Sequence, residues 1–93
     1  MSAMSTHERQ YKIKNKFGIH ARPAALFVKT VSQFQSEIQV EKGGNIASGK
    51  SIMGLLTLEG YFDSVIKVTA TGPDATEALD AIGDLIDNKF FEE

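Results

Sequence analysis

The 93-residue sequence contains no cysteine, only two histidines and no long apolar run. The absence of cysteine excludes disulfides, thiolate nucleophiles and zinc–thiolate sites. No apolar stretch approaches the roughly 20 residues that a membrane-spanning helix requires, so we expect no membrane insertion. His7 and His20 lie far apart in the sequence, so we expect neither a metal site nor a cofactor.

Charge and length disfavour two further classes of function, nucleic-acid binding and autonomous catalysis. A formal net charge of −2 gives no basic field to hold nucleic acid. The length suits one compact domain that is too small to enclose a deep substrate cavity, so we expect surface chemistry carried out with partners rather than an autonomous enzyme. Residues 1–7, with His7, lack the pattern of a signal peptide. We predict a flexible lead-in over residues 1–7, a single domain over residues 8–93, a monomer and a cytoplasmic location.

Two segments repeat apolar residues at helical spacing, and each predicts a helix with one buried face. Gly72-Pro73-Asp74 precedes the second segment, where Asp74 is a candidate cap or first-turn acid. The apolar density of residues 51–58 predicts a third, shorter helix. The first apolar stripe comprises Ala24, Phe27, Val28, Val31 and Phe34, and the second comprises Ala75, Ala78, Leu79, Ile82, Leu85 and Ile86.

Other segments alternate apolar and polar residues, which is typical of strands with one buried face. Gly43-Gly44 predicts a tight hairpin turn into a short strand over residues 45–48. The order of elements predicts an α+β fold, an open-faced β-sandwich in which a four-stranded antiparallel sheet carries three helices on one face. The alternating apolar residues are Tyr11 and Ile13, Ile38 and Val40, and Ile66, Val68 and Ala70.

Candidate chemistry is concentrated in Gly18–Pro23, where His20 stands at the mouth of a predicted helix. Pro23 is tolerated in a first helical turn. The amides of Ala21 and Arg22 have no partner inside the helix and lie at its positive end, so we expect them and the Arg22 guanidinium to bind phosphate oxygens. The same positive surroundings disfavour imidazolium, so we expect a largely neutral His20 that can attack phosphorus. A lone histidine at a helix start is usually a polar cap, but the combination of His20 with Arg22 and the Gly18 turn favours a reactive role for His20.

This segment resembles the active-site signature of the HPr family, the histidine-containing phosphocarriers of the phosphoenolpyruvate-dependent sugar phosphotransferase system. Residues 49–56, with the sequence GKSIMGLL, resemble that family's regulatory serine motif, and the likeness covers roughly residues 8–88. The resemblance implies that enzyme I phosphorylates His20 on Nδ1 and that His20 passes the group to enzyme IIA-type acceptor domains. It also implies that Ser51 is the serine modified by HPr kinase/phosphorylase in many bacteria.

Ser51 has an ordinary interpretation as well, because serine is a favoured helix cap. The apolar residues after it crowd too closely to share one buried stripe, so part of this helix should be exposed. A phosphate on Ser51 would add charge beside that apolar surface and weaken partner binding. On the first predicted helix, Ala25 and Lys29 lie outside the buried stripe and, four residues apart, share one face. The predicted partner contacts are Ala25, Lys29, Ile52 and Met53.

Two segments depart from the family pattern. Phe17 stands where many members have a small polar residue. A large apolar residue at this position is familiar from the nitrogen-related branch of the family. In Glu59–Asp63, the pair Tyr61 and Phe62 replaces small residues and either extends a contact surface or closes the core. Two functions therefore stay open, a carrier in sugar uptake and a purely regulatory phosphocarrier in nitrogen or carbon signalling. An RNA-binding module is disfavoured because the expected open sheet face carries no aromatic platform.

Overall fold

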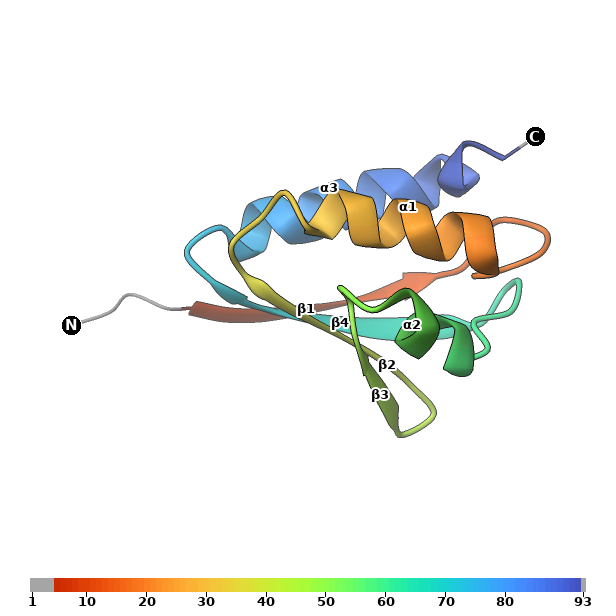
Figure 1. The fold of residues 1–93 in the computed structure, drawn as a ribbon, viewed down its shortest axis with the longest axis horizontal. Coiled ribbons are helices and arrows are strands. Elements are labelled where there is room, and N and C mark those ends of the chain that lie inside the picture. Colours follow the sequence, from red (N-terminus) through yellow and green to blue (C-terminus); the bar gives the residue numbers. More distant parts are fainter. Residues whose placement is uncertain (1–4, 93) are drawn as a thin grey trace.

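The computed structural model describes residues 5–92, which form a four-stranded antiparallel sheet with its helices on one face (Figure 1). The strands pair in the order β1-β4-β2-β3, so the predicted α+β open-faced sandwich is confirmed. Among these residues no helix is long and apolar enough to cross a membrane. The elements are β1 (Ser5–Lys12), α1 (Ala21–Val31), β2 (Glu37–Lys42), β3 (Asn45–Ser48), α2 (Ile52–Thr57), β4 (Val65–Gly72), α3 (Ala75–Asp87) and a 3₁₀ turn η1 (Lys89–Phe91).

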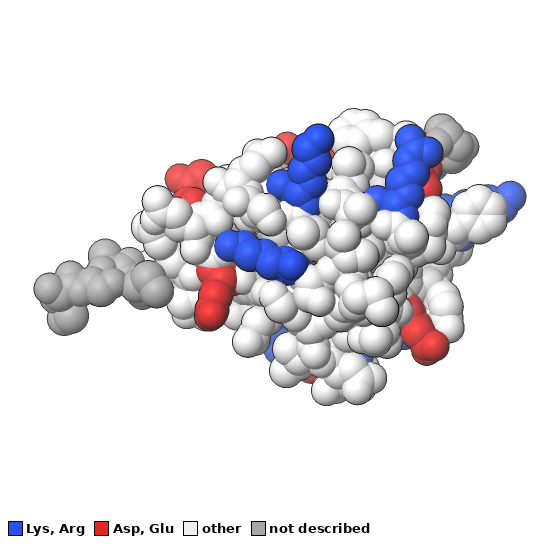
Figure 2. All heavy atoms as spheres, viewed as in Figure 1, with Lys and Arg blue, Asp and Glu red and all other residues white. Residues whose placement is uncertain are grey.

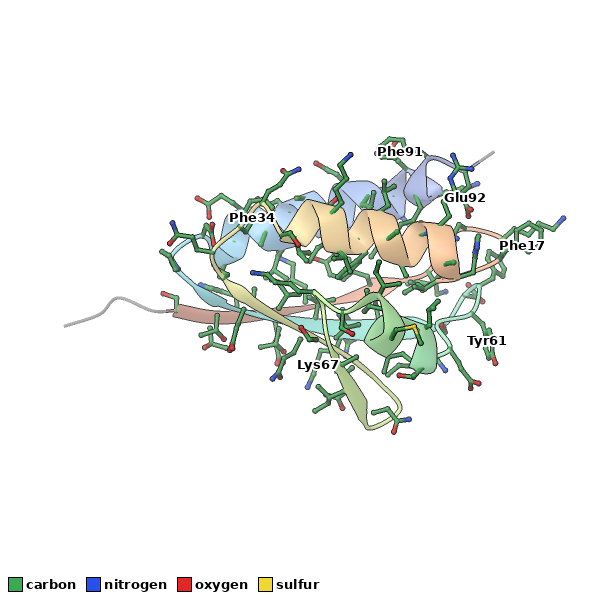
Figure 3. All side chains as sticks on the ribbon, in the orientation of Figure 1. Phe17, Phe34, Tyr61, Lys67, Phe91 and Glu92 are labelled. Atoms are coloured by element: carbon green, nitrogen blue, oxygen red, sulfur yellow. The ribbon has the colours of Figure 1, made fainter. Side chains whose placement is uncertain are left out.

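The two central strands bury alternate side chains, as the sequence pattern predicts. Ile38 and Val40 of β2 face the helices together with Ile66 and Val68 of β4. On the other face, Lys67 Nζ lies 3.4 Å from Glu41 and 3.9 Å from Glu8 (Figure 3). These charged side chains are exposed to solvent, so the open face is a solvated surface and not a second core. Exposed ion pairs of this kind contribute little to stability.

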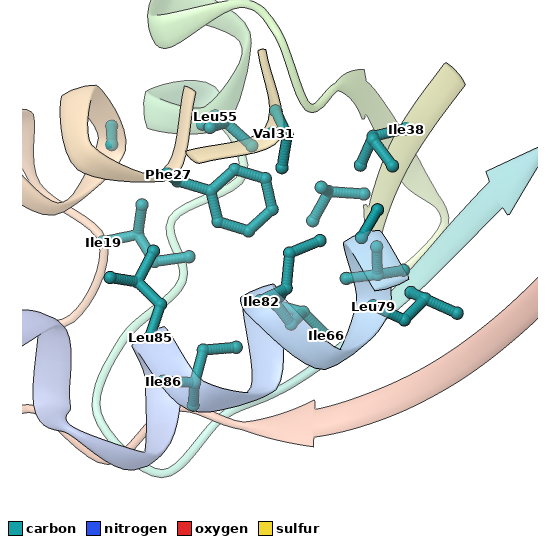
Figure 4. Packing of buried hydrophobic residues seen from close by; sticks show 14 of the residues in the cluster. Ile19, Phe27, Val31, Ile38, Leu55, Ile66, Leu79, Ile82, Leu85 and Ile86 are labelled. Carbon is teal, nitrogen blue, oxygen red and sulfur yellow. The ribbon is translucent and has the colours of Figure 1, made fainter. Parts of the chain in front are cut away.

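The helices close a single apolar layer over the sheet. All six predicted core residues of α3 are buried, which confirms the helical periodicity read from the sequence. In α1 the centre of the stripe is buried at Ala24, Phe27 and Val31, and Val28 is partly buried. Phe34, the last residue of the predicted stripe, lies beyond the end of α1 and is also partly buried. Figure 4 shows Phe27 between residues of α2, α3 and the segment before α1, so this ring ties the helices to the sheet.

The first strand begins earlier than predicted. Ser5 pairs with Gly72 and His7 pairs with Ala70, in a ladder that runs to Lys12. The flexible lead-in predicted over residues 1–7 is therefore wrong at residues 5–7, and residues 1–4 lie outside the described residues. Side-chain alternation could not indicate this because the strand is almost entirely exposed, and backbone pairing to β4 holds it in place.

Asp74 connects the start of α3 to the loop after α1. Asp74 occupies the N-cap position, as predicted, but its side chain makes no hydrogen bond to the first turn of α3. Its carboxylate instead accepts hydrogen bonds from the backbone amides of Gln35 and Ser36, each at 2.9 Å, and from the Ser36 hydroxyl. The Ser36 hydroxyl bond, followed by the amide bonds, lowers the pKa of Asp74 below its ordinary value of 3.8.

Substitution Asp74→Asn tests this connection. A carboxyl whose folded pKa is depressed stabilises the fold above its unfolded pKa, and this contribution is lost as pH falls through the folded pKa. We expect the variant to have a lower free energy of unfolding than the wild type at pH 7. The deficit should shrink as pH falls below 3.8. Urea unfolding across a pH series measures it, with Asp84→Asn at an exposed position as the control; a deficit that is constant with pH would contradict the account.

Candidate functional site

His20 is the N-cap residue, directly before α1. Its backbone is extended, with φ −100° and ψ −165°, and its carbonyl accepts the first helical hydrogen bond from Ala24 at 2.9 Å. The side chain makes no cap bond, so the ring is free for other contacts. The next two amides, of Ala21 and Arg22, belong to the first helical turn and have no acceptor within the helix. The structure thus places His20 directly before the two residues whose amides are predicted to bind phosphate.

A glycine turn fixes the position of His20. Gly18 has φ +69°, in the region that favours glycine, and its amide donates to the Asn15 carbonyl at 3.1 Å. The Ile19 amide then donates to the Gly60 carbonyl at 2.8 Å, which joins this loop to the α2–β4 loop. A Cβ on Gly18 would lie only 2.3 Å from the Gly60 oxygen. Glycine is therefore required both for the dihedral angle and for the close approach.

The His20 ring is about half exposed and contacts two side chains. Its side chain is 43% exposed, and its ring and the Phe17 ring are nearly perpendicular, with their centroids 6.2 Å apart. Nε2 lies 2.9 Å from Oε2 of Glu92, whose other oxygen accepts from Asn15 Nδ2 at 3.0 Å. Neither Asn15 nor Glu92 is predicted from the sequence as a site residue. No signal could have found Glu92, because it follows the last periodic segment and only the folded chain brings it to His20.

A shallow hollow of about 510 Å³ opens at this end of the molecule. Its walls include Arg22, the residue predicted to bind phosphate, and Glu92, which contacts His20. Two cations and one carboxylate therefore line the hollow. Among the described residues, no group of three or more His, Asp or Glu side chains is placed to hold a metal ion. The hollow is lined by Lys16, Phe17, Arg22, Phe91 and Glu92.

The residues predicted to contact partners lie on the surface of α1 and α2, which pack against each other. Ala25 and Lys29 are exposed on α1, and on α2 the side chains of Ile52 and Met53 are 39% and 73% exposed. Figure 2 shows basic side chains standing out over the helix layer on this face. Ser51 caps α2, because its Oγ accepts from the Gly54 amide at 2.9 Å. The ordinary role of Ser51 as a helix cap is confirmed.

Three aromatic side chains outside the core surround the same end of the molecule. Phe17, Tyr61 and Phe62 are 70%, 60% and 58% exposed. Lys42 Nζ lies over the Tyr61 ring at 5.4 Å, and Figure 3 shows Tyr61 and Phe17 at the end where α1 begins. Tyr61 and Phe62 therefore do not close the core, and the other alternative, that they extend a contact surface, stays a prediction.

Comparison with known proteins identifies the kind of site. A family model described as "PTS HPr component phosphorylation site" matches residues 7–88. The chain belongs to the HPr family. It is 42% identical to phosphocarrier protein HPr of Neisseria meningitidis over 85 residues, which cover 91% of this chain and 96% of that protein. It is 44% identical to phosphocarrier protein NPr of Shewanella violacea over 89 residues, which cover 96% and 98%.

A solved HPr structure agrees with this assignment. The HPr of Thermoanaerobacter tengcongensis matches with a TM-score of 0.89 and 50% identity, over 94% of this chain and 98% of that one. Membership of the HPr family makes the protein a phosphocarrier of the phosphotransferase system. Its partners are proteins of that system.

Substitution Gly18→Ala tests whether the glycine turn fixes this site. We expect it to destabilise the fold by more than Gly43→Ala, in urea unfolding. Gly43 also has positive φ, at +57°, but a Cβ there meets nothing within 4 Å. The control therefore carries only the dihedral cost of about 1–2 kcal/mol, whereas Gly18→Ala also displaces the backbone. Equal costs for the two variants would contradict the close-approach argument.

Proposed function

We propose that His20 accepts a phosphoryl group from phosphorylated enzyme I on Nδ1 and passes it, in the cytoplasm, to enzyme IIA-type acceptor domains. The observation that carries this proposal is the half-exposed ring at the first residue before α1, beside free amides and Arg22. The chain also matches a family model described by a phosphorylation site. Carrier chemistry suits such a position, because a partner must reach the ring from solvent twice in each cycle.

Each transfer breaks one bond to phosphorus and forms another. The lone pair of His20 Nδ1 attacks phosphorus, and the bond to the donor breaks with its electron pair returning to the donor. The phosphoryl oxygens then meet the amides of Ala21 and Arg22 and the Arg22 guanidinium. These contacts must stay modest, because about 1.4 kcal/mol of extra stabilisation would slow onward transfer about tenfold. An exposed helix end provides attraction of that limited size.

Partners would dock over α1 and α2. Ala21 and Ala25 are exposed and present only methyl groups, which leaves a low surface beside His20 for an approaching protein. Ile52 and Met53 supply exposed apolar area that suits the centre of an interface. Arg22 and Lys29 give this face a basic rim, so the complementary partner surface is acidic around an apolar centre. The proposed contacts are Ala25, Lys29, Ile52 and Met53.

Phosphorylation of Ser51 would regulate this surface. Ser51 precedes the exposed Ile52 and Met53 directly, so a phosphate there places about −1.5 to −2 charges at the edge of the docking area. A phosphate at a helix start is compatible with the fold, whereas an acidic partner would be repelled. We propose HPr kinase/phosphorylase as the modifying enzyme, with reduced phosphoryl uptake as the consequence.

Sugar uptake and purely regulatory signalling differ in the final acceptor. Our proposal predicts that the phosphorylated protein transfers its group to a sugar-specific IIA domain, and through it to a membrane permease subunit, in a reconstituted chain. The purely regulatory alternative predicts no such transfer. The experiment uses matched permease components from the same host.

The carrier proposal predicts one acid-labile phosphoryl group. After incubation with phosphoenolpyruvate and enzyme I, intact mass should show a single phosphoryl addition that acid removes. His20→Ala should abolish the addition because the nucleophile is gone, and Ser51→Ala should retain it. An acid-stable adduct, or one that survives His20→Ala, would overturn the assignment of His20.

The regulatory proposal predicts that a negative charge at position 51 slows uptake from enzyme I. We expect Ser51→Asp to lower the transfer rate about tenfold, through repulsion and desolvation at the docking surface. Gln33→Glu is the matched control, because it adds one charge at an exposed position near the far end of α1 from His20. Similar rates for the two variants would show that the position of the charge is irrelevant and would refute the docking surface.

A further inference from the structure

The C-terminal segment folds back over the loop that carries His20. After α3 the chain turns through Lys89, Phe90 and Phe91, with φ values of 54°, 55° and 57°. Three successive residues in the left-handed region are unusual for side chains with a Cβ, so packing must hold them. Phe90 supplies that packing, because it is only 2% exposed. Figure 3 shows the result, with Phe91 and Glu92 beside the start of α1.

The segment delivers the Glu92 carboxylate to two donors on the His20 loop. One oxygen lies 2.9 Å from His20 Nε2, and the other accepts from Asn15 Nδ2 at 3.0 Å. Asn15 is 1% exposed, and its Nδ2 also donates to the Gly18 carbonyl at 2.7 Å. The Glu92 side chain is itself only 15% exposed. A buried amide thus holds this carboxylate beside the His20 ring, and the buried Phe90 anchors the segment that carries it.

The contact determines which ring nitrogen is free. An ionised carboxylate can only accept hydrogen bonds, so Nε2 must carry the proton that it accepts. In the neutral ring the lone pair then lies on Nδ1, the nitrogen that faces away from Glu92. Charged side chains near the carboxylate are Lys16 and Arg22, which line the same hollow.

We propose that Glu92 is a positioning residue for phosphoryl transfer through His20, a proposal that rests on the carrier function proposed above. As Nδ1 bonds to phosphorus, the donor keeps the electron pair of its broken bond and the His20 ring becomes cationic with its Nε2 proton in place. Glu92 stabilises that proton. In the onward step the P–Nδ1 bond breaks, its pair returns to Nδ1, and the ring leaves as neutral imidazole and not as imidazolate. No proton has to be exchanged with solvent in either step.

The test compares Glu92→Ala with Asp84→Asn in the full-length protein. Asp84 is exposed on α3, so its substitution removes one negative charge without touching the ring. Nitrogen NMR of histidine-labelled, unphosphorylated protein, at a pH where the ring is neutral, reports the tautomer of His20. Rapid-quench measurement of phosphoryl uptake from enzyme I reports the rate, and backbone amide spectra confirm that each variant is folded.

We expect the wild type and Asp84→Asn to hold the proton on Nε2, and Glu92→Ala to give a mixture of tautomers. Uptake by Glu92→Ala should be about three- to tenfold slower, as expected for loss of one charge-assisted hydrogen bond. An unchanged tautomer and rate in Glu92→Ala would overturn the proposal. Failure of the wild type to accept any phosphoryl group would refute the carrier function instead, and the tautomer measurement would still report on Glu92.

Discussion

The backbone contact between residues 18–19 and Gly60 is the constraint on which the site depends. The Ile19 amide donates to the Gly60 carbonyl, and Gly18 approaches the same carbonyl more closely than any residue with a Cβ could. This contact sets the residue at which α1 begins, and therefore which side chain stands beside the free amides. Because the contact is made by main-chain atoms, the position of His20 is fixed without any side chain occupying the space that a phosphoryl group needs.

The charges around His20 favour a group that is bound and then released. The free amides at the start of α1 and the exposed Arg22 suit an anion, while the Glu92 carboxylate contacts Nε2 of the ring. Arg22 and Glu92 line the same hollow, so a cation and a carboxylate both lie at this end of the molecule. In the proposed transfer, the cation would attract the phosphoryl group, while the carboxylate would keep the ring in position. The same open geometry leaves α1 and α2 accessible to partner proteins.

Local sequence patterns predicted those parts of the structure that depend on neighbouring residues. The stripe of α3, the Gly43-Gly44 hairpin and the start of α1 at His20 all follow from spacing and turn chemistry, and the structure contains them. The features that were missed depend on contacts between distant segments. The strand from Ser5, the bonds of Asp74 to the α1–β2 loop and the contact of Glu92 with His20 bring together residues that no periodicity relates. Such contacts appear only once the sheet and helices are assembled.

The central claim is that His20 reacts through Nδ1 because the fold keeps its other ring nitrogen occupied. Phosphorus–nitrogen coupling in NMR spectra of the phosphorylated, nitrogen-labelled protein tests this most directly. The account predicts that phosphorus couples to Nδ1 of His20 while Nε2 retains its proton. Coupling to Nε2, or to any residue other than His20, would contradict it.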